Sequence, residues 1–284
     1  MIIDGKKESG IFLDKIKESI LLFDTKPALA VVIIGDDPAS QVYVKNKILA
    51  CEKVGIKSSK YSFDSISETE LVEFIENLNH DKNVNGILVQ MPLPKNINPT
   101  RIINVIDPIK DVDGFHPINL GNLLSREKTA FIPCTPLGCL YLIRQVESDL
   151  SGKNAVVIGR SITVGKPVAN LLTNNNATVT LAHSKTKNLK EICLNADILV
   201  AAVGIPEFIK HDFIKQGAIV IDVGINRIED NNRKNKLVGD VEFEKSKDIV
   251  RAITPVPGGV GPMTIAYLMS NTLKAFKLQN KNQL

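Results

Sequence analysis

Two side chains that can exchange a proton or hold a ring lie four residues apart in the segment 40–47, Ser-Gln-Val-Tyr-Val-Lys-Asn-Lys. They are Tyr43 and Lys47, and in a helix both leave the same face, one turn apart. The segment follows an apolar stretch, 28–34, whose composition predicts a buried strand. One interpretation is an exposed lysine beside a half-buried tyrosine. The other is a phenol and an amine that face a ligand at a strand end.

Other predicted strand ends also carry polar or flexible residues. Gln90 ends the apolar run "GILVQ", and the prolines at 92 and 94 stop further strand pairing. The acidic loop "KDVDG" offers Asp111 and Asp113, the segment "TPVPGGVGPMT" at 254–264 combines rigid prolines with glycines, and Gly-Ile-Asn at 224–226 ends another strand. Each has a purely structural alternative, as a strand-end cap, as turn-forming acids or as loop glycines.

The segment "NAVVIGRSITVGKP" at 154–167 has the pattern of a strand, a tight turn and a helix. Gly159 ends the strand, and Gly165 lies near the start of the helix. Doubly wound folds place a pyrophosphate at this point, against backbone N–H groups and the positive end of the helix. The spacing is not G-x-G-x-x-G, because Arg160 and Ser161 follow the first glycine, so a structural turn remains an alternative.

The end of the next strand favours NADP over NAD. An NAD site usually has an acid there that holds the ribose 2′-hydroxyl. In this chain "ATVTLA" is followed by His183-Ser184-Lys185-Thr186, which contains no acid. A hydroxyl and cations suit a 2′-phosphate, and the guanidinium of Arg160 can supply a bidentate partner. Taken singly, His183 is better interpreted as an ordinary loop histidine and Lys185 as an ordinary exposed lysine, so the prediction depends on their occurrence together with the missing acid.

Apolar runs of strand length alternate with amphipathic segments along the whole chain, which predicts parallel sheets covered by helices on both faces. The expected strands are 28–34, 58–63, 86–90, 154–159, 177–183, 197–204, 217–225 and 251–259. The expected helices are 8–22, 40–54, 67–80, 98–106, 136–147, 164–174, 188–195 and 262–277.

The predicted fold class is therefore α/β, with an N-terminal parallel-sheet domain, a Rossmann-type domain and a ligand-binding cleft between them. No long linker separates the two series of elements, so the boundary falls within ordered chain at about 120–140. We expect the last helix to pack back onto the first domain. The predicted domains are 1–135 plus 262–284, and 136–261.

Composition narrows the class of protein. With 284 residues and a net charge of +4, the chain has only short basic runs, such as 231–236 and the tail from 274, and these suit solvated segments better than a nucleic-acid surface. We expect no signal peptide, no membrane span and no metal site, and a cytoplasmic location. The cysteines lack C-x-x-C spacing, which fits a reducing compartment: Cys51, Cys134, Cys139 and Cys193.

Five motifs in order resemble the bifunctional methylenetetrahydrofolate dehydrogenase/methenyltetrahydrofolate cyclohydrolase family over essentially the whole chain. They are Y-V-x-x-K at 43–47, V-Q-x-P-L-P at 89–94, K-D-V-D-G at 110–114, G-R-S-x-x-V-G-x-P at 159–167 and P-G-G-V-G-P-M-T at 257–264. The resemblance implies oxidation of methylenetetrahydrofolate with NADP, then hydrolysis of the methenyl product to formyltetrahydrofolate. It also implies a homodimer whose ligands are one-carbon derivatives of tetrahydrofolate.

The resemblance assigns a role to each matching residue. Lys47 matches the essential lysine, Tyr43 a ring-stacking tyrosine, Gln90 the glutamine that positions the lysine, and Asp113 the aspartate that anchors the pterin. Further matches to the folate pocket are Val89, Met91, Pro257, Gly258, Gly259, Val260 and Gly261. The matches to cofactor contacts are Gly159, Arg160, Ser161, Ser184 and Ile225.

The implied hydrolysis explains why a lysine and a glutamine would be paired. Water must attack a cationic carbon and lose a proton, and a ring nitrogen must then gain one. A lysine can carry those protons when its amine is neutral, which burial and a cationic substrate both favour. Three alternatives remain: a monofunctional folate dehydrogenase, an NADP-dependent dehydrogenase of a small hydroxy or amino acid, and a non-enzymatic NADP sensor.

Overall fold

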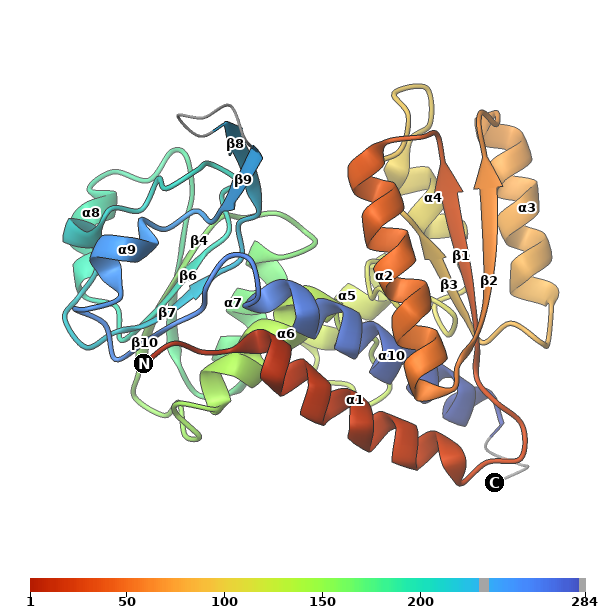
Figure 1. The fold of residues 1–284 in the computed structure, drawn as a ribbon, viewed down its shortest axis with the longest axis horizontal. Coiled ribbons are helices and arrows are strands. Elements are labelled where there is room, and N and C mark those ends of the chain that lie inside the picture. The colour runs from red at the N-terminus through yellow and green to blue at the C-terminus, as the bar shows by residue number, and fades with distance from the viewer. Residues whose placement is uncertain (230–234, 281–284) are drawn as a thin grey trace. The chain divides into compact units, whose positions relative to one another are not determined.

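The protein, studied as a computed structural model that describes residues 1–229 and 235–280, consists of two compact α/β units (Figure 1). Unit 1 comprises Met1–Ser9 and Pro133–Thr264, and unit 2 comprises Gly10–Ile132 and Ile265–Leu284. The N-terminal segment Met1–Ser9 groups with unit 1, whereas the sequence analysis placed it in the first domain. Helices α1 (Gly5–Leu21) and α10 (Val260–Gln279) contribute residues to both units.

Unit 2 is built on a three-stranded parallel sheet with the order β2-β1-β3. Its strands are β1 (Ala28–Ile34), β2 (Lys57–Phe63) and β3 (Gly86–Val89), and its helices, besides its share of α1 and α10, are α2 (Pro38–Val54), α3 (Glu68–His80), α4 (Pro99–Val105) and α5 (Pro117–Leu124). The central strand is buried almost throughout, whereas the edge strand β2 keeps a polar sequence with no buried residue. The other outer strand, β3, is buried throughout, because the loop at 110–111 pairs with Ile87 on its outer edge, whereas β2 has no such cover in the described residues.

The two faces of this sheet pack against different helices. Ala30, Val32 and Ile34 share a core with residues of α3 and α4, including Leu71 and Ile102. Because side chains alternate along a strand, the intervening residues of β1 point to the opposite face, where α2 lies (Figure 1). The carboxyl ends of β1 and β3 therefore lie beside the first turns of α2.

Unit 1 contains a five-stranded parallel sheet with the order β10-β7-β6-β4-β5. Its strands are β4 (Asn154–Ile158), β5 (Thr178–Ala182), β6 (Ile198–Ala201), β7 (Ile219–Asp222) and β10 (Ala252–Ile253), and an antiparallel hairpin joins β8 (Asn226–Glu229) to β9 (Asn235–Val238). The remaining elements of unit 1 are α6 (Cys134–Arg144), α7 (Gly165–Asn174), α8 (Leu189–Leu194), η1 (His211–Phe213) and α9 (Phe243–Ser246). The α/β fold with parallel sheets in both halves is confirmed.

Local capping explains where the observed helices depart from the predicted ones. Helix α2 begins at Pro38, two residues before the predicted start, because Asp37 Oδ2 accepts the N–H of Ser40 at 2.7 Å and proline suits the first helical position. The sequence analysis missed α5, which begins in the same way: His116 Nδ1 accepts the N–H of Ile118, with Pro117 between them. It also missed the β8–β9 hairpin, whose strands are too polar to stand out as apolar runs.

All four cysteines are buried thiols. Burial raises the pKa of Cys51 and of Cys139 to about 12, and that of Cys193 to about 11. None of the helices in residues 1–229 and 235–280 is long and apolar enough to cross a membrane. The basic run at 231–236 and the tail from 274 were predicted as solvated segments, and both lie partly outside those residues. The described start of the tail is the end of α10, where Ala275 and Phe276 are buried and Lys274 Nζ donates to the carbonyls of Lys128 and Ala130, so the prediction is wrong there.

Candidate functional site

Lys47 of α2 and Gln90, which follows β3, contact each other at the carboxyl end of the unit 2 sheet. Lys47 Nζ donates to Gln90 Oε1 at 3.0 Å, and Gln90 Nε2 donates to the carbonyl of Met91 at 2.6 Å. The backbone N–H of Gln90 donates to the carbonyl of Val32 at 2.8 Å, so Gln90 continues the pairing of β3 with β1. A neutral amide anchored to the sheet therefore orients the lysine amine.

Asp113 is coupled electrostatically to the same amine. Burial raises the pKa of the Asp113 carboxyl above its usual range, the positive charge of Lys47 lowers it, and the nearby Asp111 carboxylate raises it. Its side chain is only partly buried. Lys47, Gln90 and Asp113, which come from three separate segments of the sequence, thus form one polar cluster in unit 2.

The first acid of the K-D-V-D-G loop has a different environment. Asp111 is buried, and its carboxylate accepts the backbone N–H groups of Gly114, Phe115 and His116 at 3.1, 3.2 and 2.8 Å, and a side-chain N–H of Asn119 at 2.9 Å. Burial raises its pKa, and these hydrogen bonds lower it. Asp111 therefore shapes the loop, which leaves Asp113 as the acid with a side chain that can meet a ligand.

Tyr43 lies one turn before Lys47 on α2 and is 38% exposed. Desolvation raises the pKa of its phenol above the usual range. Val89 is buried in the sheet and Met91 is partly buried, and the Met91–Pro92 peptide bond is cis. Among Tyr43, Val89 and Met91, Tyr43 is the residue with an accessible aromatic ring.

The predicted folate loop, Pro257–Gly261, belongs to unit 1. The N–H of Lys6 donates to the carbonyl of Gly258 at 3.1 Å, and a Cβ atom at Gly5 would lie 1.8 Å from the carbonyl oxygen of Gly259. Gly258 has a φ of +105°, and the Val256–Pro257 bond is cis. The loop is therefore held tightly against the N-terminal segment of its own unit.

The turn between β4 and α7 forms a close-packed backbone cradle. Gly159 has a φ of +121°, and a Cβ there would lie 2.1 Å from the carbonyl oxygen of Ala202. A Cβ at Gly165 would lie 1.9 Å from the carbonyl oxygen of Gly159. Ser161 Oγ accepts the N–H groups of Val164 and Gly165 at 3.1 and 3.3 Å. Two of the N–H groups expected to be open to a pyrophosphate are thus capped by Ser161.

Arg160 and Ser184 lie just beyond the carboxyl ends of two neighbouring strands of the unit 1 sheet. Ile158 pairs with Ala182, and the N–H of Gly159 donates to the carbonyl of Ala182 at 2.9 Å, so β4 and β5 end side by side. Arg160 and Ser184 follow these ends, and both side chains are exposed. His183 closes the second turn, because its N–H donates to Thr186 Oγ1 at 2.9 Å.

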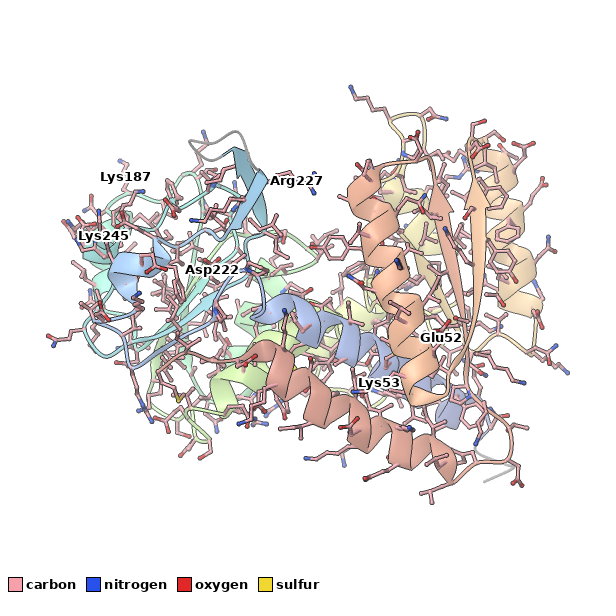
Figure 2. The ribbon with its side chains drawn as sticks, in the orientation of Figure 1. Glu52, Lys53, Lys187, Asp222, Arg227 and Lys245 are labelled. Atoms are coloured by element: carbon pink, nitrogen blue, oxygen red, sulfur yellow. The ribbon has the colours of Figure 1, made fainter. Side chains whose placement is uncertain are left out.

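Asp222 and Asp240 are two buried acids that the sequence analysis did not identify. Asp222 ends β7, as Figure 2 marks, and its carboxylate accepts the backbone N–H groups of Gly224, Asp240 and Val241 at 3.0, 2.8 and 2.9 Å. The sequence contains one hint of these acids, because in "DVG" at 222–224 and "VGD" at 238–240 a glycine lies one or two residues from an acid near a strand end. Only the folded hairpin brings the two acids together.

Asp222 is expected to make stability depend on pH. Burial raises its pKa to about 7, against about 4 in an unfolded chain. Between these two pKa values the native state holds a proton on Asp222 that the unfolded state has lost. The contribution of Asp222 to the free energy of unfolding therefore falls as pH rises from about 4 to about 7. The slope is at most about 1.4 kcal/mol per pH unit.

Carbon-13 NMR of the aspartate carboxyls, with the Asp222 signal assigned by its absence in Asp222→Asn, measures this pKa directly. The expected midpoint lies near 7. Urea unfolding at several pH values measures the linked stability, and the variant should lack the corresponding slope. A midpoint near 4 would contradict the expectation.

Comparisons with known proteins agree on one family. The family model described as tetrahydrofolate dehydrogenase/cyclohydrolase, catalytic domain, matches residues 3–113, and the one described as the NAD(P)-binding domain of the same family matches residues 133–280. The bifunctional protein FolD of Wolbachia pipientis subsp. Culex pipiens is 55% identical over 98% of this chain and 96% of its own. FolD of Acetivibrio thermocellus is 52% identical over 99% and 98%.

Solved structures give the same result. The bifunctional FolD enzyme from Campylobacter jejuni matches with a TM-score of 0.94 and 46% identity, over 100% of this chain and 99% of that one. The Trypanosoma brucei enzyme, solved with NADP cofactor and inhibitor, matches with a TM-score of 0.93 and 35% identity, over 98% of this chain and 97% of that one.

The family models match the two halves of the chain, each of which is built on a parallel sheet, so this is an α/β protein with a catalytic domain and an NAD(P)-binding domain. The family models match most of the chain, and the similarity to the bacterial relatives extends over nearly its whole length. The chain belongs to the tetrahydrofolate dehydrogenase/cyclohydrolase family.

Proposed function

We propose that this protein oxidises methylenetetrahydrofolate with NADP and then hydrolyses the methenyl product to formyltetrahydrofolate. The observation that carries the proposal is the polar cluster of Lys47, Gln90 and Asp113 in a member of this family. The bifunctional names of the relatives favour two activities over a dehydrogenase alone. The proposed functional domains are 1–135 plus 262–284 for folate and 136–261 for NADP.

The cluster suits the hydrolytic step. The amine of Lys47 would carry the proton that the attacking water loses to the ring nitrogen, while Gln90 Oε1 holds the amine in place. Asp113 would anchor the pterin, and the accessible ring of Tyr43 would stack on the substrate and exclude water. The resemblance also assigns folate contacts to Val89 and Met91 of unit 2 and to the loop Pro257–Gly261 of unit 1.

The residues of unit 1 fit an NADP molecule. Gly159 and Gly165 let the turn fold tightly, because a Cβ at either position would overlap backbone atoms of the protein itself, and the tight turn would bring its backbone close to the pyrophosphate. Arg160 and Ser184 lie beyond adjacent strand ends, where a 2′-phosphate can meet a guanidinium and a hydroxyl, while Ser161 and Ile225 would border the bound molecule. NADP, when bound, supplies the hydride acceptor, and the protein supplies its position.

Arg160→Ala is expected to remove much of the preference for NADP. Loss of a charge-assisted contact to the 2′-phosphate should raise the KM for NADP about tenfold to a hundredfold. The KM for NAD, which lacks that phosphate, should change less than threefold. Steady-state dehydrogenase kinetics with each cofactor measure both values.

Lys187→Ala provides the matched control, because Lys187, labelled in Figure 2, is an exposed cation in the segment that follows β5, next to the strand that precedes Arg160. It should leave both KM values within twofold of the wild type. Equal increases for NADP and NAD in Arg160→Ala would place the guanidinium away from the 2′-phosphate.

An absorbance assay with methylenetetrahydrofolate, run separately with NADP and with NAD, tests the proposed function. Reduction of NADP followed by loss of the methenyl chromophore is the expected result. Accumulation of the methenyl product would leave only the dehydrogenase. Absence of turnover with either cofactor, in protein shown to be folded by circular dichroism, would overturn the proposal.

A homodimer and a cytoplasmic location are part of the same proposal. The buried thiols are compatible with a reducing compartment, since none is paired in a disulfide. Sedimentation equilibrium at several concentrations tests the dimer, and fractionation of the source cells tests the location. A monomer at all concentrations would remove the dimer from the proposal without affecting the chemistry.

A further inference from the structure

Asp240 lies just after β9 and is 0% exposed. Its Oδ2 accepts the backbone N–H groups of Val203 and Gly204 at 2.6 and 3.0 Å. Its Oδ1 accepts the N–H of Ile205 at 3.1 Å and a side-chain N–H of Asn226 at 2.9 Å. One carboxylate thus binds three successive backbone N–H groups and a side chain from a second segment, and charge-assisted hydrogen bonds of this kind are strong.

These partners follow the carboxyl ends of two adjacent strands. The segment Val203–Ile205 comes after β6, and Asn226 comes after β7. Strand β6 also neighbours β4, which ends at the Gly159 cradle, and Ala202 is the residue whose carbonyl would meet a Cβ at Gly159. Asp240 therefore fixes the segment against which the predicted phosphate-binding turn packs.

The two buried acids and two glycines are fitted to one another. Asp222 accepts the backbone N–H of Asp240, so it holds the second carboxylate in register. A Cβ at Gly224 would lie 2.1 Å from Asp240 Oδ1, and a Cβ at Gly239 would lie 1.8 Å from Asp222 Oδ2. Only glycine leaves room for the carboxylates at these two positions.

The hydrogen bonds of Asp240 suit a carboxylate and not an amide. Both oxygens of Asp240 accept two N–H groups each, so an asparagine in either orientation would point its NH₂ group at two donors. The ion pairs found within residues 1–229 and 235–280 include neither Asp240 nor Asp222, so N–H dipoles compensate the buried charge of Asp240.

We propose that Asp240 is the positioning residue for the nicotinamide half of the cofactor. In a doubly wound sheet the two halves of a dinucleotide lie on opposite sides of the first strand. Arg160 and Ser184 lie at the β4 and β5 ends, so the other half faces the ends of β6 and β7. There Ile225, 45% exposed, adjoins the Asn226 that Asp240 holds. This inference rests on the proposed NADP-dependent dehydrogenase function.

The test compares Asp240→Asn with the wild type, using NADP and adenosine 2′,5′-bisphosphate as probes in isothermal titration calorimetry. The bisphosphate carries only the adenosine half. The expected result is a loss of NADP affinity of about tenfold or more, against a change below twofold for the bisphosphate. The KM for NADP should rise and the dehydrogenase kcat fall, while hydrolysis of methenyltetrahydrofolate stays within threefold of the wild type.

Asp248→Asn, at an exposed acid of the same unit, is the matched control and should change none of these values. If Asp240→Asn fails to fold, Asn226→Ala, which removes a single hydrogen bond to Asp240, should weaken NADP binding about threefold to tenfold and spare the bisphosphate. Equal losses for both probes, or no loss for either, would overturn the positioning role. Failure of the wild type to bind NADP would instead overturn the proposed function.

Discussion

Lys47→Met is expected to lower hydrolysis of methenyltetrahydrofolate by about a hundredfold to ten-thousandfold, the range that general acid–base catalysis contributes. Methionine keeps the long apolar stem of lysine, so packing on α2 should be preserved. The variant removes the amine that donates to Gln90 Oε1 at 3.0 Å, and with it the group proposed to carry protons in the hydrolytic step. Loss of the methenyl chromophore, followed in a stopped-flow or steady-state assay, measures the effect.

Lys45→Met is the matched control, because Lys45 is an exposed lysine on the same helix, two residues away and on a different face. It should retain hydrolysis within twofold of the wild type. The affinity of Lys47→Met for NADP should also be unchanged, since the proposed NADP residues belong to the other unit. Loss of NADP binding, or hydrolysis at the wild-type rate, would contradict the proposed role of Lys47.

Gly159→Ala is expected to destabilise unit 1 by about 3 kcal/mol or more and to abolish NADP binding. The added Cβ would lie 2.1 Å from the carbonyl oxygen of Ala202, which is backbone and cannot rotate away, and the φ of +121° is unfavourable for alanine. The turn must therefore move, and the close backbone approach proposed for the pyrophosphate is lost with it. Urea unfolding and calorimetric titration with NADP measure the two effects.

Gly152→Ala is the control that separates the cost of backbone strain from the cost of a steric clash in Gly159→Ala. Gly152 lies in the same unit with a φ of +73°, and a Cβ there would have no atom within 4 Å. It should cost only the backbone strain of about 1 to 2 kcal/mol and leave NADP binding intact. Equal costs for the two variants would show that the contact with Ala202 is not what restricts position 159.

The sequence predicted those parts of the fold that depend on continuous apolar runs. Strand β1, for example, lies at the predicted residues 28–34, because a central parallel strand is buried on both faces and must be apolar along its length. The β8–β9 hairpin was missed for the opposite reason: its strands are polar, and pairing alone defines them. Helix α5 was missed because it is short and begins at an unusual cap, His116.

The candidate site divides in the same way. Motifs within one segment, such as Tyr43 with Lys47, could be read from helical spacing, and the contact of Lys47 with Gln90 is observed, although their roles remain proposals. The link between Asp222 and Asp240 was not predictable, because it depends on the closure of a hairpin and on hydrogen bonds from backbone groups of three separate segments. Backbone N–H groups carry no sequence signal.

Each unit contains buried cysteine thiols, so the rate at which those thiols react measures the local opening of that unit. Cys51 belongs to unit 2, while Cys134, Cys139 and Cys193 belong to unit 1. A thiol reacts with alkylating reagents as the thiolate, and a pKa of about 12 at Cys51 and Cys139 keeps that form scarce until the surrounding core separates. Timed alkylation followed by peptide mass spectrometry therefore measures the opening equilibrium of each unit separately, without any engineered cysteine. Added NADP or folate should slow the labelling of the cysteines in the unit that binds it.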